Sequence, residues 1–266
     1  MHSLAYKGVS GGRWHLYGVG EAAENVALLD HAKGLYFPPA RGISSQTAFQ
    51  VGSTPRKVVH DERIMELLIG TRGVTTDQHD QVEADWWADW SLEEDGRLEV
   101  DGGVRWLDVR LKQWPDATWA IAPDVNNFLD HNMQIVSHNP AWQGGVRPIE
   151  KSGSGAIPIP ITNPTDRPMW LNFVGTPGSW TLPDGLSSRM VPMPTLSQGW
   201  KLYTDPQVRT LEVDNGAGLW PEIMKGVTFT KAIPPRTRTP VLIYPTIAGS
   251  GTIRVEMVDQ YSRPWG

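Results

Sequence analysis

The sequence predicts a mainly β protein of two domains with one long helix. Its 27 glycines and 22 prolines divide the chain into short segments, which is typical of β structure with many turns. Only residues 76–93 combine a helix start signal with apolar residues at helical spacing. The chain has 266 residues, more than one domain usually holds, so we expect domains at 1–150 and 151–266.

Composition excludes several classes of protein. The 24 Lys and Arg residues and 29 Asp and Glu residues nearly balance, which argues against nucleic-acid binding by bulk electrostatics. The absence of cysteine excludes disulfides and thiolate metal sites. The first thirty residues lack a cationic start followed by an apolar core, so we expect no secretory signal. No apolar run is long enough to cross a bilayer.

The stretch 63–114 is the most regular part of the sequence. Residues 63–69 form an apolar run that we expect to be a buried strand ending at Gly70. Thr75 with Gln78 three residues later matches a capping box, in which side chains satisfy the free amides of a helix start. After this helix, residues 97–111 alternate around Asp101-Gly102-Gly103 and predict a β-hairpin.

Tryptophans mark one side of the predicted helix. Val82, Trp86 and Trp90 follow at i, i+4 and i+8 and therefore share one stripe. Burying a tryptophan removes about 150–250 Å² from water, so we interpret the stripe as core rather than binding surface. Trp87 lies off the stripe, with Glu83 between it and Val82. Either Glu83 is paired, or Trp87 faces a neighbouring subunit.

The other segments of the first half are shorter. We expect a strand pair within residues 1–20 and either a helical turn or a loop at 21–30. Residues 35–42 contain Pro38-Pro39 and predict an extended, exposed loop or arm, because consecutive prolines cannot donate to a sheet. Residues 46–60 suggest a further strand, with its apolar part at 46–52, and residues 132–136 another.

The second half predicts a β-sandwich. Residues 151–156 are rich in Ser and Gly and are interpreted as a flexible linker at the domain boundary. Short apolar or alternating segments separated by turn residues follow it, a spacing typical of sandwiches. These predicted strands are 157–161, 169–174, 180–182, 208–213, 240–244 and 252–258.

Three sequence patterns resemble catalytic or metal sites, and we assign none of them that role. Residues 8–12 have the letters of a nucleophile elbow around Ser10, without the strand-to-helix context that this motif requires. His79 and Glu83 are spaced as a metal pair but lack a third ligand. Residues 93–95 are an acidic run, which we interpret as solvated. We therefore expect no catalytic residue, no metal and no cofactor.

The second half is also rich in tryptophan, which leaves a carbohydrate-binding or receptor-binding interpretation open. A sandwich with spare indole rings can stack a sugar. The candidates are Trp170, Trp180, Trp200 and Trp220. A glycan-cleaving enzyme that uses Glu93 or Glu94 is a third, weaker alternative.

The order and spacing of these segments resemble the distal tail protein (Dit) family of long-tailed phages, in particular the minor tail proteins of phages infecting actinobacteria. One part of the resemblance spans residues 49–53, 63–69, the tryptophan-rich helix and 98–111. The other spans 163–171, 204–209 and 233–266. The family has no invariant short motif, so order and spacing carry the resemblance.

The resemblance implies an N-terminal, ring-forming, split-barrel-like β domain with one helix, followed by a galectin-like β-sandwich. It implies a structural protein of the virion tail tip or baseplate, made in the host cytoplasm. That protein would form a hexameric ring and contact the tail tube, tail hub and tape measure proteins. A ring subunit needs exposed aromatic and polar surfaces for its neighbours, for which we select Tyr36, Phe37, Arg41 and Trp87.

Overall fold

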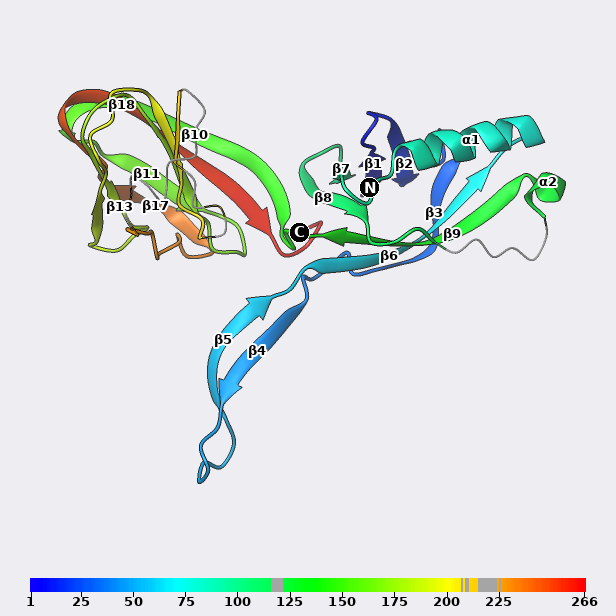
Figure 1. Ribbon diagram of the computed structural model, residues 1–266, viewed down its shortest axis with the longest axis horizontal. Helices are drawn as coiled ribbons and strands as arrows, with labels where there is room; N and C mark the ends of the chain where they lie inside the picture. Colours follow the sequence, from blue (N-terminus) through cyan, green and yellow to red (C-terminus); the bar gives the residue numbers. More distant parts are fainter. Residues whose placement is uncertain (116–121, 207, 209–210, 215–223, 225) are drawn as a thin grey trace. The chain divides into compact units, whose positions relative to one another are not determined.

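The computed structural model describes residues 1–115, 122–206, 208, 211–214, 224 and 226–266 (Figure 1). The chain divides into two compact units. Unit 1 contains Met1–Gln143 and Ser262–Gly266, and unit 2 contains Gly144–Tyr261. The chain therefore leaves unit 1 and returns to it for its last residues.

Unit 1 is built from antiparallel strands and one long helix, which confirms the predicted mainly β class. Its elements are β1 (Leu4–Lys7), β2 (Arg13–Tyr17), β3 (Val26–Lys33), β4 (Ala40–Ser45), β5 (Thr54–His60), β6 (Arg63–Arg72), α1 (Thr76–Ala88), β7 (Gly96–Val100), β8 (Arg105–Leu111), the short α2 (Pro123–Asn126) and β9 (Phe128–Ser137). The main sheet has the order β2-β1-β7-β8-β9-β6-β3. Strand β3 also contacts β2, so the sheet curls toward closure.

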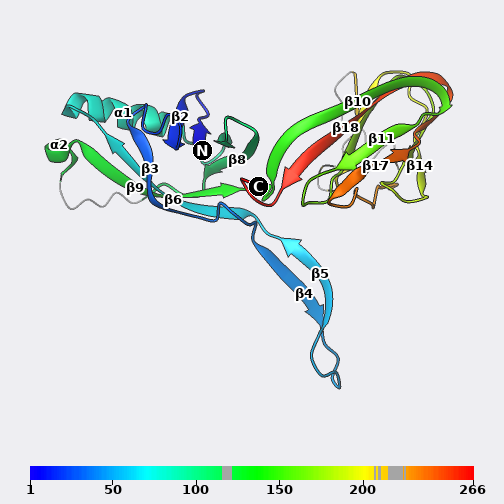
Figure 2. The same cartoon turned by 180° about the vertical axis from the view of Figure 1, so that it is seen from behind.

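The helix α1 begins where the sequence predicts and ends earlier. The Thr75 side chain accepts from the Gln78 N–H at 3.2 Å, which confirms the N-cap. The Gln78 side chain in turn accepts from the Val74 N–H. The helix ends at Ala88 rather than near 93, because Asp89 leaves the helix to accept hydrogen bonds from the β1–β2 turn. Figures 1 and 2 show α1 running alongside β6, which it contacts.

Strands β4 and β5 pair only with each other and form a separate two-stranded sheet, which Figure 1 shows as a long arm. We call residues 40–60 the arm. Nearly every side chain in both strands is exposed. The strand expected at 46–52 is wrong, because these residues form the loop at the arm's tip and the strand begins at Thr54. Pro55 fits this strand because β5 is an edge with few obligatory donors.

Two further predictions for unit 1 are corrected. Residues 26–33 form β3, where we expected a helical turn or a loop. The β6 strand does not end at Gly70 but continues to Arg72. A Cβ atom at Gly70 would lie about 3.0 Å from Leu29 and 3.1 Å from Phe128, so glycine here admits side chains of the neighbouring strands.

Unit 2 is a β-sandwich. Its strands are β10 (Trp142–Ala156, which begins in unit 1), β11 (Ile159–Asn163), β12 (Leu171–Gly175), β13 (Trp180–Pro183), β14 (Met190–Pro192), β15 (Trp200–Tyr203), β16 (Leu211–Val213), β17 (Thr237–Ile243) and β18 (Thr246–Tyr261). One sheet has the order β16-β15-β12-β18-β10, with β13 joining β14 to β18, and the other is the pair β11-β17. Ile159 and Ile243 of this pair pack in one buried cluster with Phe173 and Val255 of the larger sheet.

The predicted linker at 151–156 is wrong, because these residues belong to β10 and pair beside β18. Backbone hydrogen bonds need no particular side chains, so a Ser/Gly composition does not prevent a strand. The boundary expected at 150/151 thus lies inside a strand. For the predicted strand 208–213, Arg209 and Thr210 lie outside the described residues, and Leu211–Val213 form β16. In the described part of the chain, no helix has the length and apolar character that a bilayer crossing requires.

Candidate functional site

Three of the four predicted interface residues lie together at the base of the arm. Tyr36 and Phe37 precede β4 and are 54% and 64% exposed, with their ring centroids 6.5 Å apart. Arg41 lies on β4, and its Nε is 3.2 Å from the Asp61 carboxylate. Aromatic rings and an arginine exposed at one place are the residue types enriched in protein interfaces. Their assignment as subunit contacts remains a prediction.

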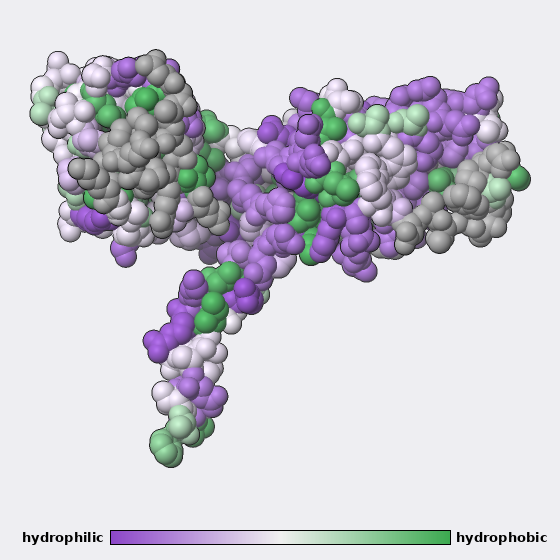
Figure 3. Space-filling model, in the orientation of Figure 1, coloured by the Kyte–Doolittle hydropathy of each residue, from purple (hydrophilic) through white to green (hydrophobic). Residues whose placement is uncertain are grey.

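The tip of the arm is a surface that the sequence did not single out. Phe49 and Val51 are fully exposed there. Figure 3 shows apolar residues gathered at the arm's far end. A sequence-level signal existed, because Phe49 and Val51 flank a polar residue before Gly52, but this alternation also fits a strand.

The fourth interface residue, Trp87, lies on α1 and is half-buried. Its indole Nε1 donates to Glu83 Oε2 at 2.9 Å, and its ring packs edge-on against His131 at 4.8 Å. Glu83 also accepts from Thr71 and lies 2.9 Å from His131 Nε2. Of the two explanations for Trp87, pairing of Glu83 is therefore confirmed. Whether Trp87 also contacts a neighbouring subunit remains a prediction.

The surroundings of Glu83 determine its charge. Burial alone would raise its pKa, but the hydrogen bonds from His131, Thr71 and Trp87 and the charge of His131 outweigh burial and hold the pKa below its usual range. His79 is fully buried, with its Nε2 4.0 Å from Glu83 Oε1. Within the residues that the structure describes, no group of three or more His, Asp or Glu is arranged to hold a metal ion.

The stripe of tryptophans on α1 is core, as predicted. Trp86 is completely buried and Trp90 is 4% exposed. Trp90 stacks on Tyr6 at 3.8 Å, and Trp86 packs edge-on against Tyr6 and Trp14. These aromatic contacts join the end of α1 to β1 and β2.

The residues with the letters of a nucleophile elbow have a structural role that centres on Asp89. The Asp89 carboxylate accepts from Ser10 N–H at 3.2 Å, from the Ser10 hydroxyl and from Trp14 Nε1 at 2.6 Å. A Cβ atom at Gly12 would lie about 1.9 Å from the same carboxylate, so glycine is required there. Ser10 is thus held in a β-turn rather than presented as a nucleophile. The sequence did not reveal Asp89, because its partners lie more than seventy residues away along the chain.

The acidic run at 93–95 is a turn. The backbone amides of Glu93 and Glu94 both donate to the Ser91 hydroxyl at 3.0 Å. Asp95 pairs with Arg110 at 2.7 Å, whereas the side chains of Glu93 and Glu94 are exposed. This arrangement agrees with the solvated interpretation.

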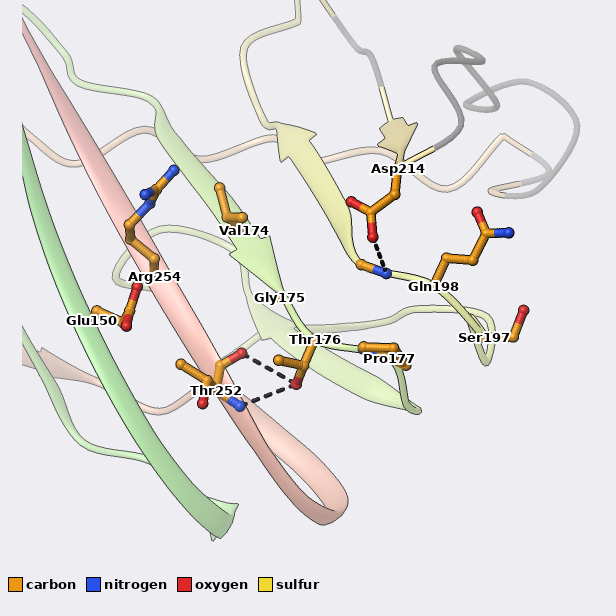
Figure 4. A pocket seen from close by; sticks show the side chains of 11 residues that line it. Glu150, Val174, Gly175, Thr176, Pro177, Ser197, Gln198, Asp214, Thr252 and Arg254 are labelled. Carbon is orange, nitrogen blue, oxygen red and sulfur yellow. Dashed lines mark hydrogen bonds between the residues drawn. The ribbon is translucent and has the colours of Figure 1, made fainter.

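Unit 2 has an open cavity of about 570 Å³ at the edge of its larger sheet (Figure 4). Carboxylate, amide and guanidinium groups line it, contributed by Glu150, Gln198, Asp214 and Arg254. On one side of the cavity, the Asp214 carboxylate accepts from the Gly199 N–H at 2.9 Å. On the other side, the Thr176 hydroxyl accepts from the Thr252 N–H at 3.0 Å. Each hydrogen bond holds two lining residues in place. Such a recess has the donors and acceptors that recognise a polyhydroxylated ligand.

Of the tryptophans proposed for sugar stacking, the three that the structure describes do not line this cavity. Trp180 and Trp200 are buried, pack edge-on at 6.1 Å and donate their indole N–H groups to the Thr176 carbonyl. Trp170 is half-buried against the core cluster, and Trp220 lies outside the described residues. Trp180 and Trp200 are therefore core residues.

The comparisons with known proteins identify the fold. No family profile matches the sequence, and no curated protein matches it. The crystal structure of the Dit protein (gp 19.1) of phage SPP1, described as a paradigm of the hub adsorption apparatus of phages infecting Gram-positive bacteria, is similar with a TM-score of 0.65. The similarity covers 98% of this chain and 99% of that one, at 11% identity.

Two baseplate structures of phage P2 in the activated conformation, with Ca and with Sr, are also similar. Each has a TM-score of 0.52 at 12% identity, over 99% of both chains. Identities this low establish shared architecture rather than shared activity. The chain therefore has, over nearly its whole length, the fold of a phage distal tail protein.

Proposed function

We propose that this chain is a structural protein of the phage virion, an adaptor at the distal end of the tail that joins the tail tube to the hub or baseplate. The observation that carries the proposal is the similarity to SPP1 Dit, which includes both units and 98% of the chain. A resemblance confined to one unit would fit any protein that contains a domain with the fold of that unit. We expect no enzymatic activity.

A ring of six copies is part of the proposal. Support comes from the exposed aromatic and cationic residues at the base of the arm, and from the exposed tip at Phe49 and Val51. Subunits that close a ring need two different complementary surfaces, one on each side. The tail tube, tail hub and tape measure proteins are the proposed partners.

The test is electron microscopy of the purified protein, with mass measurement in solution. We expect closed rings of six copies, and antibody labelling at the tail tip of the virion. A protein that stays monomeric at high concentration and is absent from purified virions would overturn the proposal. The sequence resemblance further suggests that the phage infects actinobacteria. Antibody labelling of tails from such phages would support this host range.

A second candidate function is glycan binding by unit 2, favoured by the cavity lined by Glu150, Gln198 and Arg254. Binding of cell-wall glycans, measured by calorimetry, would be weakened by Gln198→Ala together with Glu150→Gln. The control is Glu212→Gln, a half-buried carboxylate of unit 2 that does not line this cavity. Absence of glycan binding in the unaltered protein would exclude this function.

A further inference from the structure

We propose that the arm of one copy docks along the outer face of α1 in a second copy, which supplies the head-to-tail contact of the ring. This inference rests on the proposed function and names the partner surface of the arm. The arm is a sheet with no covering layer in the described structure, and its strands pair only with each other. Such a two-stranded ribbon is marginal alone and gains stability by packing on another surface.

The arm is basic and amphipathic. Residues 40–60 contain Arg41, Arg56 and Lys57 and no acidic residue. In the observed register Arg41 lies opposite Val59 and Ile43 opposite Lys57, which places these four side chains on one face. This face therefore combines two cations with two β-branched apolar side chains.

The outer face of α1 has the complementary character. Residues 76–88 include no Lys or Arg. The exposed positions recur at helical spacing, and they are Asp77, Gln78, Asp80, Gln81, Ala84, Asp85 and Ala88. Among the described residues, none of the ion pairs involves Asp77, Asp80 or Asp85, nor Arg56 or Lys57 of the arm. On the face of the arm that carries Arg41 and Lys57, Arg41 is paired with Asp61, so Lys57 is the cation without an ion pair among the described residues.

A recess beside α1 offers a place for the apolar tip of the arm. A cavity of about 450 Å³ lies between the helix and the β1–β2 hairpin, and Trp14, Val82, Asp85 and Ala88 are among its lining residues. Phe49, at the tip, is fully exposed and would bury apolar surface by entering such a recess.

The dimensions of the two surfaces agree. Along β5, Lys57 lies about 10 Å from Thr54, where the tip begins. Along α1, Asp77 lies about 12 Å from Asp85, beside the recess. With the start of the tip placed beside Asp85 at the recess, Lys57 would therefore lie over Asp77 and Asp80. Because the donor and acceptor surfaces differ, the contact is heterologous and propagates from copy to copy until the ring closes.

Cysteine cross-linking tests the contact directly, because the natural chain has no cysteine. Ile43→Cys with Gln81→Cys preserves every charge and should give a ladder of covalent oligomers with a short bismaleimide. In the control, the second cysteine moves to the exposed turn as Glu94→Cys. A ladder in the control equal to that of the test pair would overturn the proposal.

Charge exchange provides the second measurement. Lys57→Glu, and separately Asp80→Lys, should each weaken self-association by at least about tenfold in sedimentation experiments. The two changes together should restore it. The control Glu94→Lys makes the same change in net charge as Asp80→Lys, on unit 1 away from α1, and should have little effect.

The outcomes separate this inference from the proposed function. Rings that persist in both charge variants would overturn the arm–helix contact and leave the adaptor proposal standing. A natural chain that forms no ring would overturn both. A third outcome is that only the arm variant has a defect, and that the defect appears in assembly of the virion tail but not in self-association of the purified protein. The arm would then bind another acidic virion protein, and the proposal of a second copy would be wrong.

Discussion

Glu83 is the residue of unit 1 whose charge most clearly contributes to stability. Its pKa lies below the usual value of 4.5, so its stabilising contribution is fully present above that pH and is lost as the pH falls through the lowered pKa. We expect Glu83→Gln to reduce the free energy of unfolding by about 1.5–3 kcal/mol at pH 7, since hydrogen bonds to a buried charge are lost. The difference from the natural protein should shrink as the pH falls below 4.5 and through the lowered pKa.

Chemical denaturation at several pH values measures this effect. Asp85→Asn is the matched control, because Asp85 is an exposed carboxylate on the same helix. Its unfolding free energy should change by less than about 0.5 kcal/mol at every pH. A Glu83→Gln deficit that stays constant over the whole acidic range in which the protein remains folded would show that the charge of Glu83 is not the cause.

Trp86 and Trp87 are adjacent and should respond differently to truncation. Trp86 is fully buried among Tyr6, Trp14 and Trp90, so Trp86→Ala should cost about 3–5 kcal/mol and cause misfolding. Trp87 is half-buried, and Trp87→Ala should leave a folded protein with weakened self-association. Thermal unfolding and sedimentation separate the two effects. Equal losses of stability in Trp86→Ala and Trp87→Ala would show that Trp87 is a core residue without a separate role in self-association.

At the scale of elements, the sequence best predicts those helices and hairpins whose ends are set by turn and capping residues nearby in the chain. The hairpin β7–β8 forms as expected around Asp101, Gly102 and Gly103, all three of which have positive φ. The cap at Thr75 also forms as expected. Both depend on residues a few positions apart, which a single sequence displays.

The sequence does not predict elements whose bounds depend on residues far away along the chain. The strand β3 lacks regular alternation because its register with β6 shifts between Leu28 and Ala32. The end of α1 depends on Asp89 reaching Ser10 and Trp14. For the candidate site, the sequence predicts an extended, exposed loop or arm at 35–42 but not the pairing of β4 with β5, because an exposed ribbon has no buried side to impose a pattern.

The arm should be dispensable for folding and necessary for assembly. Replacing residues 43–57 by a short Asn-Gly turn removes exposed side chains and none of the core. We expect an unfolding free energy within about 1 kcal/mol of the natural protein and a loss of rings. Calorimetry and electron microscopy measure the two properties. A large loss of stability would mean that the arm packs on its own unit.

For the whole molecule, the last residues of the chain hold unit 1 together. The buried Arg63 donates to the carbonyls of Leu35, Pro140 and Ser262, and Trp265 stacks on His2 at 4.9 Å. Removing residues 262–266 should destabilise unit 1 by about 2–4 kcal/mol, because these hydrogen bonds and the aromatic packing are lost.

Hydrogen exchange resolves this prediction by unit. Peptides from β6 and β7 should exchange faster in the truncated protein, and peptides from β12 and β15 should not change. The matched control is Arg263→Ala, which keeps the backbone carbonyl that Arg105 contacts. Faster exchange in both units would mean that the tail supports more than unit 1.

The return of the chain to unit 1 also links the folding of the two units. All of unit 2 lies between Gln143 and Ser262 in the sequence. While unit 2 is unfolded, bringing the carbonyl of Ser262 to Arg63 and the ring of Trp265 to His2 requires closure of a long flexible loop, which costs chain entropy. Folding of unit 2 removes most of that cost, so it should favour completion of unit 1, to which the proposed arm and helix both belong.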